Sequence, residues 1–117
     1  MFFHLRIHQT LFPKRLEILN GCGEPGVAAK FSEFLRDKRV DVVRSENADN
    51  FDYSTTILIQ RNENTEGLKY VADALKFDSR NSDQVMVSID PETDVDITLI
   101  IGKDFNSITA VKSFLKN

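Results

Sequence analysis

The sequence predicts one domain of the α/β (α+β) class, built from strands and helices that follow one another along 117 residues. Two observations predict this class. Short runs of β-branched and aliphatic residues are separated by longer segments in which apolar residues recur every three or four positions. The composition, with 41% hydrophobic and 28% charged residues, is typical of a globular protein rather than of a disordered chain.

The strands are predicted from alternation and from apolar runs. Residues 2–7 alternate, which predicts an N-terminal strand with Phe3, Leu5 and Ile7 on its apolar face. Residues 46–53 hold Asn and Asp at the density of a turn between two strands. The remaining strands are expected over residues 15–20, 40–45, 54–61, 85–89 and 95–101.

Three segments have helical spacing. The first runs from Gly26 to about Arg39, and its apolar stripe consists of Val27, Phe31, Phe34 and Leu35. The second begins at Asn64 or Thr65, and its stripe consists of Leu68, Val71, Ala72 and Leu75. Ile108, Val111 and Leu115 mark a short final helix. From Arg15 the order is β-α-β-β-α-(β)-β, so we expect a ferredoxin-like, split β-α-β-β-α-β sandwich with an extra N-terminal strand and a short C-terminal helix.

Gly21, Gly23 and Gly26 follow the first strand of this unit with the G-x-G-x-x-G spacing of a dinucleotide-binding turn. Glu24 inside the turn would repel a pyrophosphate, and Pro25 lacks the N–H that a phosphate-binding helix start offers. We therefore interpret the glycines as a structural turn that needs positive φ and close helix–strand packing, and we expect no nucleotide cofactor.

Three blocks of the sequence resemble the LytR C-terminal domain family. They are LEILNGCGEPGVAAKFSEFL from residue 16, VDVVRSENADNFDYSTTILI from residue 40 and DVDITLIIGKDF from residue 94. They match, in order, the family's N-G-(small)-G-x-P-G opening, its N-A-D-x-F-D-Y hairpin and its closing strand with G-x-D-F. Cys22 departs from the family's usual Thr, Ser or Asn. The resemblance divides the chain into an N-terminal strand or leader (1–14), a LytR C-terminal-like domain (15–106) and a C-terminal helix (107–117).

The resemblance implies a non-catalytic accessory domain of the cell envelope, carried by a parent protein that is anchored in the membrane. Its expected partner is a wall glycan or a wall-assembly protein, and the expected location is extracytoplasmic if an anchor precedes this chain. The alternative is a cytoplasmic protein-interaction module without a glycan ligand. The candidate binding surface, taken from the family-like blocks, consists of Asn20, Gly21, Asp52 and Tyr53. For the turn that holds Asp52 and Tyr53, the other interpretation is purely structural, with Asx-turns and an inward-packed aromatic ring.

The residue types exclude several other functions. Residues 16–117 carry 12 basic and 18 acidic residues, so the body of the domain has a charge of −6, which argues against nucleic-acid binding. A single cysteine and two histidines support neither a metal site nor a catalytic triad, so we expect no enzyme activity and no cofactor. The alternating acids from Asp90 to Asp96 lack the glycine of a calcium loop, and no run approaches the ~20 apolar residues of a membrane span.

The alternating pattern of the predicted N-terminal strand suggests that this strand contributes to self-association. A strand with one apolar face either adds to its own sheet or pairs with the edge of another copy, which would give a homodimer. The other interpretation is that these residues are a leader of a longer protein.

Overall fold

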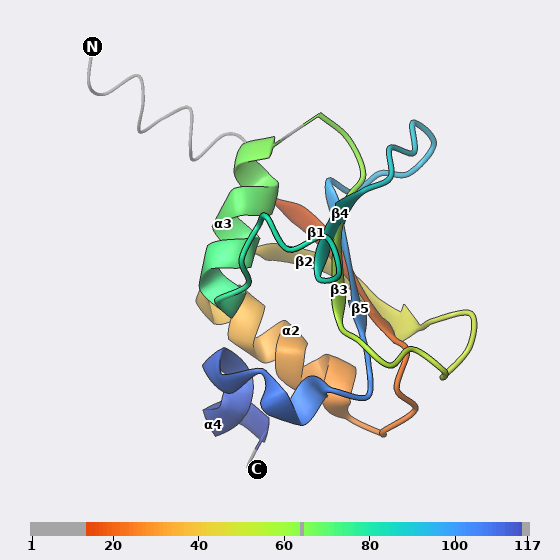
Figure 1. The fold of residues 1–117 in the computed structure, drawn as a ribbon, viewed down its shortest axis with the longest axis vertical. Helices are drawn as coiled ribbons and strands as arrows, with labels where there is room; N and C mark the ends of the chain where they lie inside the picture. Colours follow the sequence, from red (N-terminus) through yellow and green to blue (C-terminus); the bar gives the residue numbers. More distant parts are fainter. Residues whose placement is uncertain (1–13, 64, 116–117) are drawn as a thin grey trace.

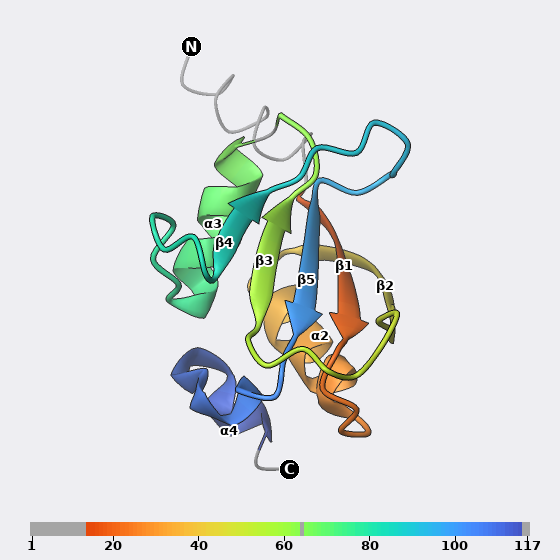
Figure 2. The same ribbon diagram turned by 45° about the vertical axis from the view of Figure 1, so that its right-hand side comes forward.

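The structure, a computed structural model that describes residues 14–63 and 65–115, has two layers (Figures 1 and 2). One layer is a five-stranded sheet, and the helices lie together against one face of that sheet. The elements in chain order are β1 (Arg15–Asn20), α2 (Val27–Asp37), β2 (Asp41–Asn47), β3 (Ile57–Gln60), α3 (Thr65–Leu75), β4 (Val85–Val87), β5 (Ile97–Ile101), the 3-10 turns η1 (Phe105–Ser107) and η2 (Thr109–Val111), and α4 (Lys112–Leu115).

The two long helices form where the apolar spacing predicts them. The stripe of α2 is buried over its whole length, from Val27 to Leu35, and that of α3 from Leu68 to Leu75. A residue in the left-handed conformation follows each of these helices, Arg39 at φ 66° after α2 and Lys76 at φ 62° after α3. After α2, the N–H of Val40 donates to the carbonyl of Leu35 (3.0 Å), which satisfies one of the last helical acceptors.

The strand order across the sheet is β2-β1-β5-β3-β4. β1 is parallel to both of its neighbours, β2 and β5, while β3 is parallel to β4 and antiparallel to β5. The mixed α+β class is confirmed, but the predicted ferredoxin-like order is not. A split β-α-β unit has a further strand between its two strands, whereas here β1 and β2 are adjacent. The sheet is instead two β-α-β units, β1-α2-β2 and β3-α3-β4, joined by β5.

β5 takes the central position because it is buried on both faces. All five of its residues are buried. Ile97, Leu99 and Ile101 face the helices and pack with strand residues such as Leu16 and Leu58. A strand that buries every side chain gains most in the middle of a sheet, where neighbours cover both edges, and each fully buried aliphatic side chain contributes about 1.5–3 kcal/mol.

Residues 48–56, which contain the family's N-A-D-x-F-D-Y block except for its first residue, Asn47, are not a hairpin. β2 and β3 lie on opposite sides of β1 and β5, so the segment must pass the carboxyl ends of both central strands. We call it the crossing loop. Main-chain hydrogen bonds fasten it on the way: Ala48 N–H to Asn20 O (2.9 Å), Tyr53 N–H to Gly21 O (3.1 Å) and Lys103 N–H to Tyr53 O (2.8 Å).

The final helix is shorter than the sequence predicts. Ile108 has an extended backbone (φ −86°, ψ 90°) and separates η1 from η2, so only Lys112–Leu115 form an α-helical turn. This segment still packs on the domain, since the ring of Phe114 meets that of Phe34 edge-on at a centroid distance of 5.6 Å.

The predicted N-terminal strand and the helix cap at Asn64 lie outside the described residues. Within the described ranges, no helix combines the length and the hydropathy that crossing a membrane requires.

Candidate functional site

Three loops meet at one end of the sheet, where β1 and β5 end and β3 begins. They are residues 21–26 after β1, residues 102–107 after β5 and the crossing loop. Two glycines allow the close approach. A Cβ on Gly21 would lie 2.6 Å from Cδ2 of Tyr53, and a Cβ on Gly102 would lie 2.4 Å from the carbonyl carbon of Thr55. This end of the sheet holds all the residues that the sequence predicts for the binding surface, namely Asn20, Gly21, Asp52 and Tyr53.

Asn20 is buried, and its side chain organises the turn after β1. Its Oδ1 accepts from the main-chain N–H groups of Cys22 (3.1 Å) and Gly23 (3.0 Å) and from the Cys22 thiol (3.2 Å). Its Nδ2 donates to the carbonyl of Glu24 (3.0 Å). The amide is therefore occupied inside the protein, and its first role is to hold the turn in shape.

Gly23 and Gly26 have the positive φ expected of a structural turn, but the two positions need glycine for different reasons. Gly23 and Gly26 both have φ 83°. A Cβ on Gly23 would meet the side chain of Phe51 at 3.3 Å, whereas a Cβ on Gly26 would meet nothing within 4 Å. The expectation that Gly26 is needed for close helix–strand packing is wrong, and what it supplies is the left-handed backbone that begins α2.

The exposed part of the crossing loop carries the other predicted residues. Asp52 is exposed, and its N–H is held by Oδ1 of Asn50 (2.8 Å) in an Asx-turn. Tyr53 is half-buried and its hydroxyl donates to Oδ1 of Asp49 (2.8 Å). This hydrogen bond, with the burial and the negative charge of Asp49, raises the pKa of Tyr53. Phe51 lies 45% exposed over Gly23, so this surface combines an accessible ring with carboxylates.

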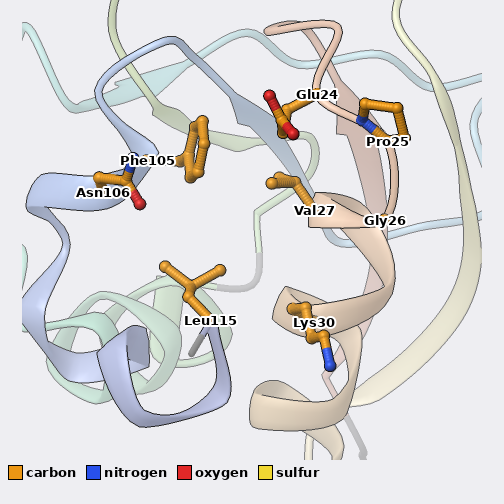
Figure 3. Close-up of a pocket in the computed structure, with 8 residues that line it drawn as sticks. All are labelled: Glu24, Pro25, Gly26, Val27, Lys30, Phe105, Asn106 and Leu115. Carbon is orange, nitrogen blue, oxygen red and sulfur yellow. The ribbon is translucent and has the colours of Figure 1, made fainter. Parts of the chain in front are cut away.

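A pocket of about 390 Å³ lies on the helix side of the same end of the sheet, between the glycine turn and the loop after β5 (Figure 3). The apolar side chains of Val27, Phe105 and Leu115 surround one space, with Glu24 at the rim. The full lining consists of Glu24, Pro25, Gly26, Val27, Lys30, Phe105, Asn106 and Leu115. Within residues 14–63 and 65–115, no hydrogen bond or ion pair engages the side chains of Glu24, Lys30 or Asn106.

The sequence reasoning missed this pocket. Its walls come from parts of the chain about 80 residues apart, which only the pairing of β1 with β5 brings together. One signal was available, because Phe105 ends the third family-like block. The neighbouring Asp104 fixes the loop: its Oδ1 accepts from the N–H (2.9 Å) and the hydroxyl (2.6 Å) of buried Thr56.

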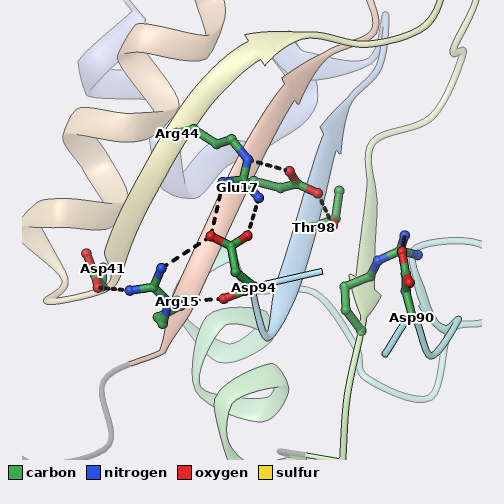
Figure 4. A network of polar contacts seen from close by, with 8 residues as sticks. Arg15, Glu17, Asp41, Arg44, Asp90, Asp94 and Thr98 are labelled. Atoms are coloured by element: carbon green, nitrogen blue, oxygen red, sulfur yellow. Dashed lines mark hydrogen bonds and ion pairs between the residues drawn. The ribbon is translucent and has the colours of Figure 1, made fainter. Parts of the chain in front are cut away.

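A polar network lies on the sheet face opposite the helices (Figure 4). Arg44 on β2 pairs with Glu17 on β1 (3.0 Å) and with Asp94, and Glu17 also accepts from the Thr98 hydroxyl (2.7 Å). Asp94 is bridged between Arg44 and Arg15. The hydrogen bond from Arg44 lowers the pKa of Asp94, and the carboxylates raise that of Arg44. The network joins three strands, and two of the alternating acids serve as ion-pair partners, Asp94 here and Asp90 with Arg61 (3.6 Å).

Comparisons with known proteins agree with this architecture. The family model described as LytR cell envelope-related transcriptional attenuator matches residues 14–105. Among solved structures, the chain is similar to the soluble domain of a conserved hypothetical secreted protein from Mycobacterium marinum, with a TM-score of 0.51, 14% identity, and coverage of 89% of this chain and 84% of that one. At this identity the likeness concerns the fold alone. No curated protein matches the sequence.

The family match spans more than three quarters of the chain and includes every strand of the sheet and both long helices. The three sequence blocks meet at one end of the sheet, where they form the glycine turn, the crossing loop and the loop after β5. The chain therefore belongs to the LytR C-terminal, cell envelope-related family.

Proposed function

We propose that this chain is a non-catalytic accessory domain of the cell envelope that binds wall glycan in the pocket between the glycine turn and the loop after β5. The observation that carries the proposal is the composition of that pocket. Apolar side chains of Val27, Phe105 and Leu115 lie beside the unengaged polar side chains of Glu24 and Lys30. The family's description as cell envelope-related supports the compartment.

Sugars and amino sugars match this arrangement chemically. A pyranose ring has an apolar C–H face, which packs on aromatic and aliphatic side chains, and a rim of hydroxyl or amide groups, which need donors and acceptors. Glu24 accepts hydrogen bonds, Lys30 donates them, and the amide of Asn106 does both. The volume of about 390 Å³ lies in the range of small-ligand sites and is sufficient for one or two sugar rings rather than a long polymer.

The rim of the pocket is preorganised. The carbonyl of Glu24 is held by Asn20 (3.0 Å), and the loop on the other side is held by Asp104 through Thr56. A rigid rim lowers the entropy cost of ordering the site on binding, which raises the affinity for a ligand that fits it. In this proposal Asn20 and Gly21 support the site without touching the ligand, and Asp52 with Tyr53 forms a second surface on the far side of the glycine turn.

The proposal also places the domain outside the cytoplasm, on a parent protein that a membrane anchor holds near the wall. The family's description as cell envelope-related supports this location. We expect no turnover of glycan substrates by the purified chain, because neither surface contains an activated nucleophile. Turnover that disappears with Glu24→Gln would contradict the non-catalytic assignment.

The test is binding of soluble wall muropeptides, measured by isothermal titration, with a pull-down on purified peptidoglycan as a second readout. Glu24→Gln, Lys30→Ala and Asn106→Ala should each weaken binding several-fold without changing the fold, because within the described part of the chain these side chains form no hydrogen bond or ion pair. The matched controls are Asp52→Asn and Phe51→Ala on the crossing loop, which should bind as the parent chain does.

The controls separate the two surfaces. Loss of binding in the crossing-loop variants alone would move the site to Asp52 and Tyr53 and overturn the assignment to the pocket. Absence of binding by the parent chain, at low salt and in both readouts, would overturn glycan binding altogether.

A further inference from the structure

The outer edge of the sheet at β4 is apolar and exposed. Met86, Val87 and Ile89 expose 37%, 62% and 51% of their surface. Met86 and Val87 belong to β4, the last strand in the sheet order, and Ile89 lies two residues beyond its end. The other outer strand, β2, has a different character, since its exposed residues are Ser45, Glu46 and Asn47. Natural sheets commonly protect an outer strand with charged residues, which β4 lacks.

The backbone of β4 is also available for pairing. Gln84 O accepts from Leu58 N–H (2.7 Å), and Ser88 N–H donates to Gln60 O (2.9 Å), so these groups point toward β3. By the alternation of a strand, the N–H and C=O of Val87 point the other way, out of the sheet. An extended chain placed there would gain main-chain hydrogen bonds in addition to apolar contacts.

We propose that the β4 edge is the docking surface for residues 2–8 of a second copy of this chain, so that two copies exchange N-terminal strands. The side-chain patterns are complementary. Val85 and Val87 share one face of β4, Ile89 follows two positions beyond Val87, and Phe3, Leu5 and Ile7 share one face of the incoming segment with the same spacing. With these two sets on the helix side, His4, Arg6 and His8 face water on the other side.

Chain length favours a second copy over the same copy. Leu16, Ile97, Gln60 and Val87 lie in one row across the sheet. A strand outside β4 would stand four inter-strand steps from β1, which is roughly 19 Å. The path from residue 8 to residue 14 has six Cα steps and reaches at most about 20–22 Å when fully extended and straight.

That straight path is already occupied. At this end of the sheet, Asp96 N–H donates to Arg15 O, Arg61 N–H donates to Asp96 O, and Asp90 N–H donates to Arg61 O, each at 2.8 or 2.9 Å. These bonds fill the sheet end between β1 and β4 with backbone, as Figure 2 shows for the segment that joins β4 to β5. A link within one copy would have to go around this backbone, and its length does not allow the detour.

The experiment measures mass by light scattering over a concentration series for the full chain, a chain lacking residues 1–12, and Val87→Lys. The full chain should reach twice 13.3 kDa, and both variants should stay at the monomer mass. Phe51→Lys, an exposed apolar residue at the opposite end of the sheet, is the matched control and should remain a dimer. Circular dichroism verifies that each variant is folded.

Hydrogen exchange then locates the contact. The amides of Val87 and Ile89 should exchange slowly in the full-chain dimer and at least ten-fold faster after removal of residues 1–12. A full chain that is monomeric at every concentration would overturn the proposal, and so would a Val87→Lys variant that remains dimeric. Protection that appears on β2 instead of β4 would also overturn it.

Discussion

The ring of Tyr53 lies directly on the backbone of Gly21, so closely that a Cβ on Gly21 would stand 2.6 Å from Cδ2 and 2.9 Å from Cγ of the ring. The main chains of the two residues are also joined, since Tyr53 N–H donates to Gly21 O (3.1 Å). This relationship connects the turn after β1 to the crossing loop, and it explains why the first family-like block has glycine before the small residue at position 22.

Gly21→Ala should lower the free energy of unfolding by about 1–3 kcal/mol, because the added methyl group overlaps the base of the Tyr53 ring. Urea denaturation measures the change. Adding Tyr53→Ala should recover most of the loss caused by Gly21→Ala, since the ring that clashes is then absent. If the two substitutions prove additive, the overlap is not the cause.

Gly102→Ala should destabilise the domain by more than Gly21→Ala, about 3 kcal/mol or more, because a Cβ there would lie 2.4–2.8 Å from main-chain atoms of Thr55. Backbone cannot be removed by mutation, so Thr55→Ala should give no rescue. Urea denaturation of the single and double variants makes the comparison. Full recovery in the double variant would contradict this account of Gly102.

Gly26→Ala should cost about 1 kcal/mol through backbone conformation alone, because Gly26 has φ 83° and its Cβ would meet no other atom. Gly26→Asn should cost less, since asparagine tolerates the left-handed region better than alanine. Thermal and urea unfolding of both variants give the order. An alanine variant as stable as the parent chain would show that α2 can begin without a left-handed residue.

Lys76→Gly should stabilise the domain by about 0.5–1 kcal/mol, because Lys76 ends α3 in the left-handed conformation at φ 62°, where glycine is unstrained. Lys69→Gly, on the exposed side of the same helix, is the matched control and should destabilise by about 1 kcal/mol. The opposite signs separate the capping effect from a general effect of glycine. Two changes of the same sign would contradict the prediction.

The ion pairs of Asp94 should make stability depend on pH. Arg44 lowers the pKa of Asp94 in the folded state, so the carboxylate stabilises the fold above its unfolded pKa and stops doing so as the pH falls through the lower, folded value. Asp94→Asn should therefore lower the urea midpoint at pH 7, and its difference from the parent chain should begin to shrink near the unfolded pKa of 3.8 and disappear only below the lower, folded value. Glu92→Gln on the same loop is the control. Because Asp94 is exposed, high salt should reduce the difference at pH 7.

The local elements of this protein follow from its sequence alone. The stripe from Val27 to Leu35 and that from Leu68 to Leu75 predicted α2 and α3, and the apolar run from Ile97 to Ile101 predicted the most buried strand. The left-handed backbone of the glycine turn also followed from its composition. These features depend on side-chain spacing and backbone sterics within about a dozen residues, which the sequence contains directly.

Only the tertiary structure decided how these elements are combined. The position of β5 between β1 and β3 turned the family's expected hairpin into a crossing loop and brought Phe105 beside Glu24. It also left Asn20 buried with its amide engaged, where the sequence suggested a binding residue. The physical reason is that strand pairing uses main-chain groups, which are the same at every residue. The order of strands therefore depends on which arrangement buries the most apolar surface across distant segments, and no local pattern records that choice.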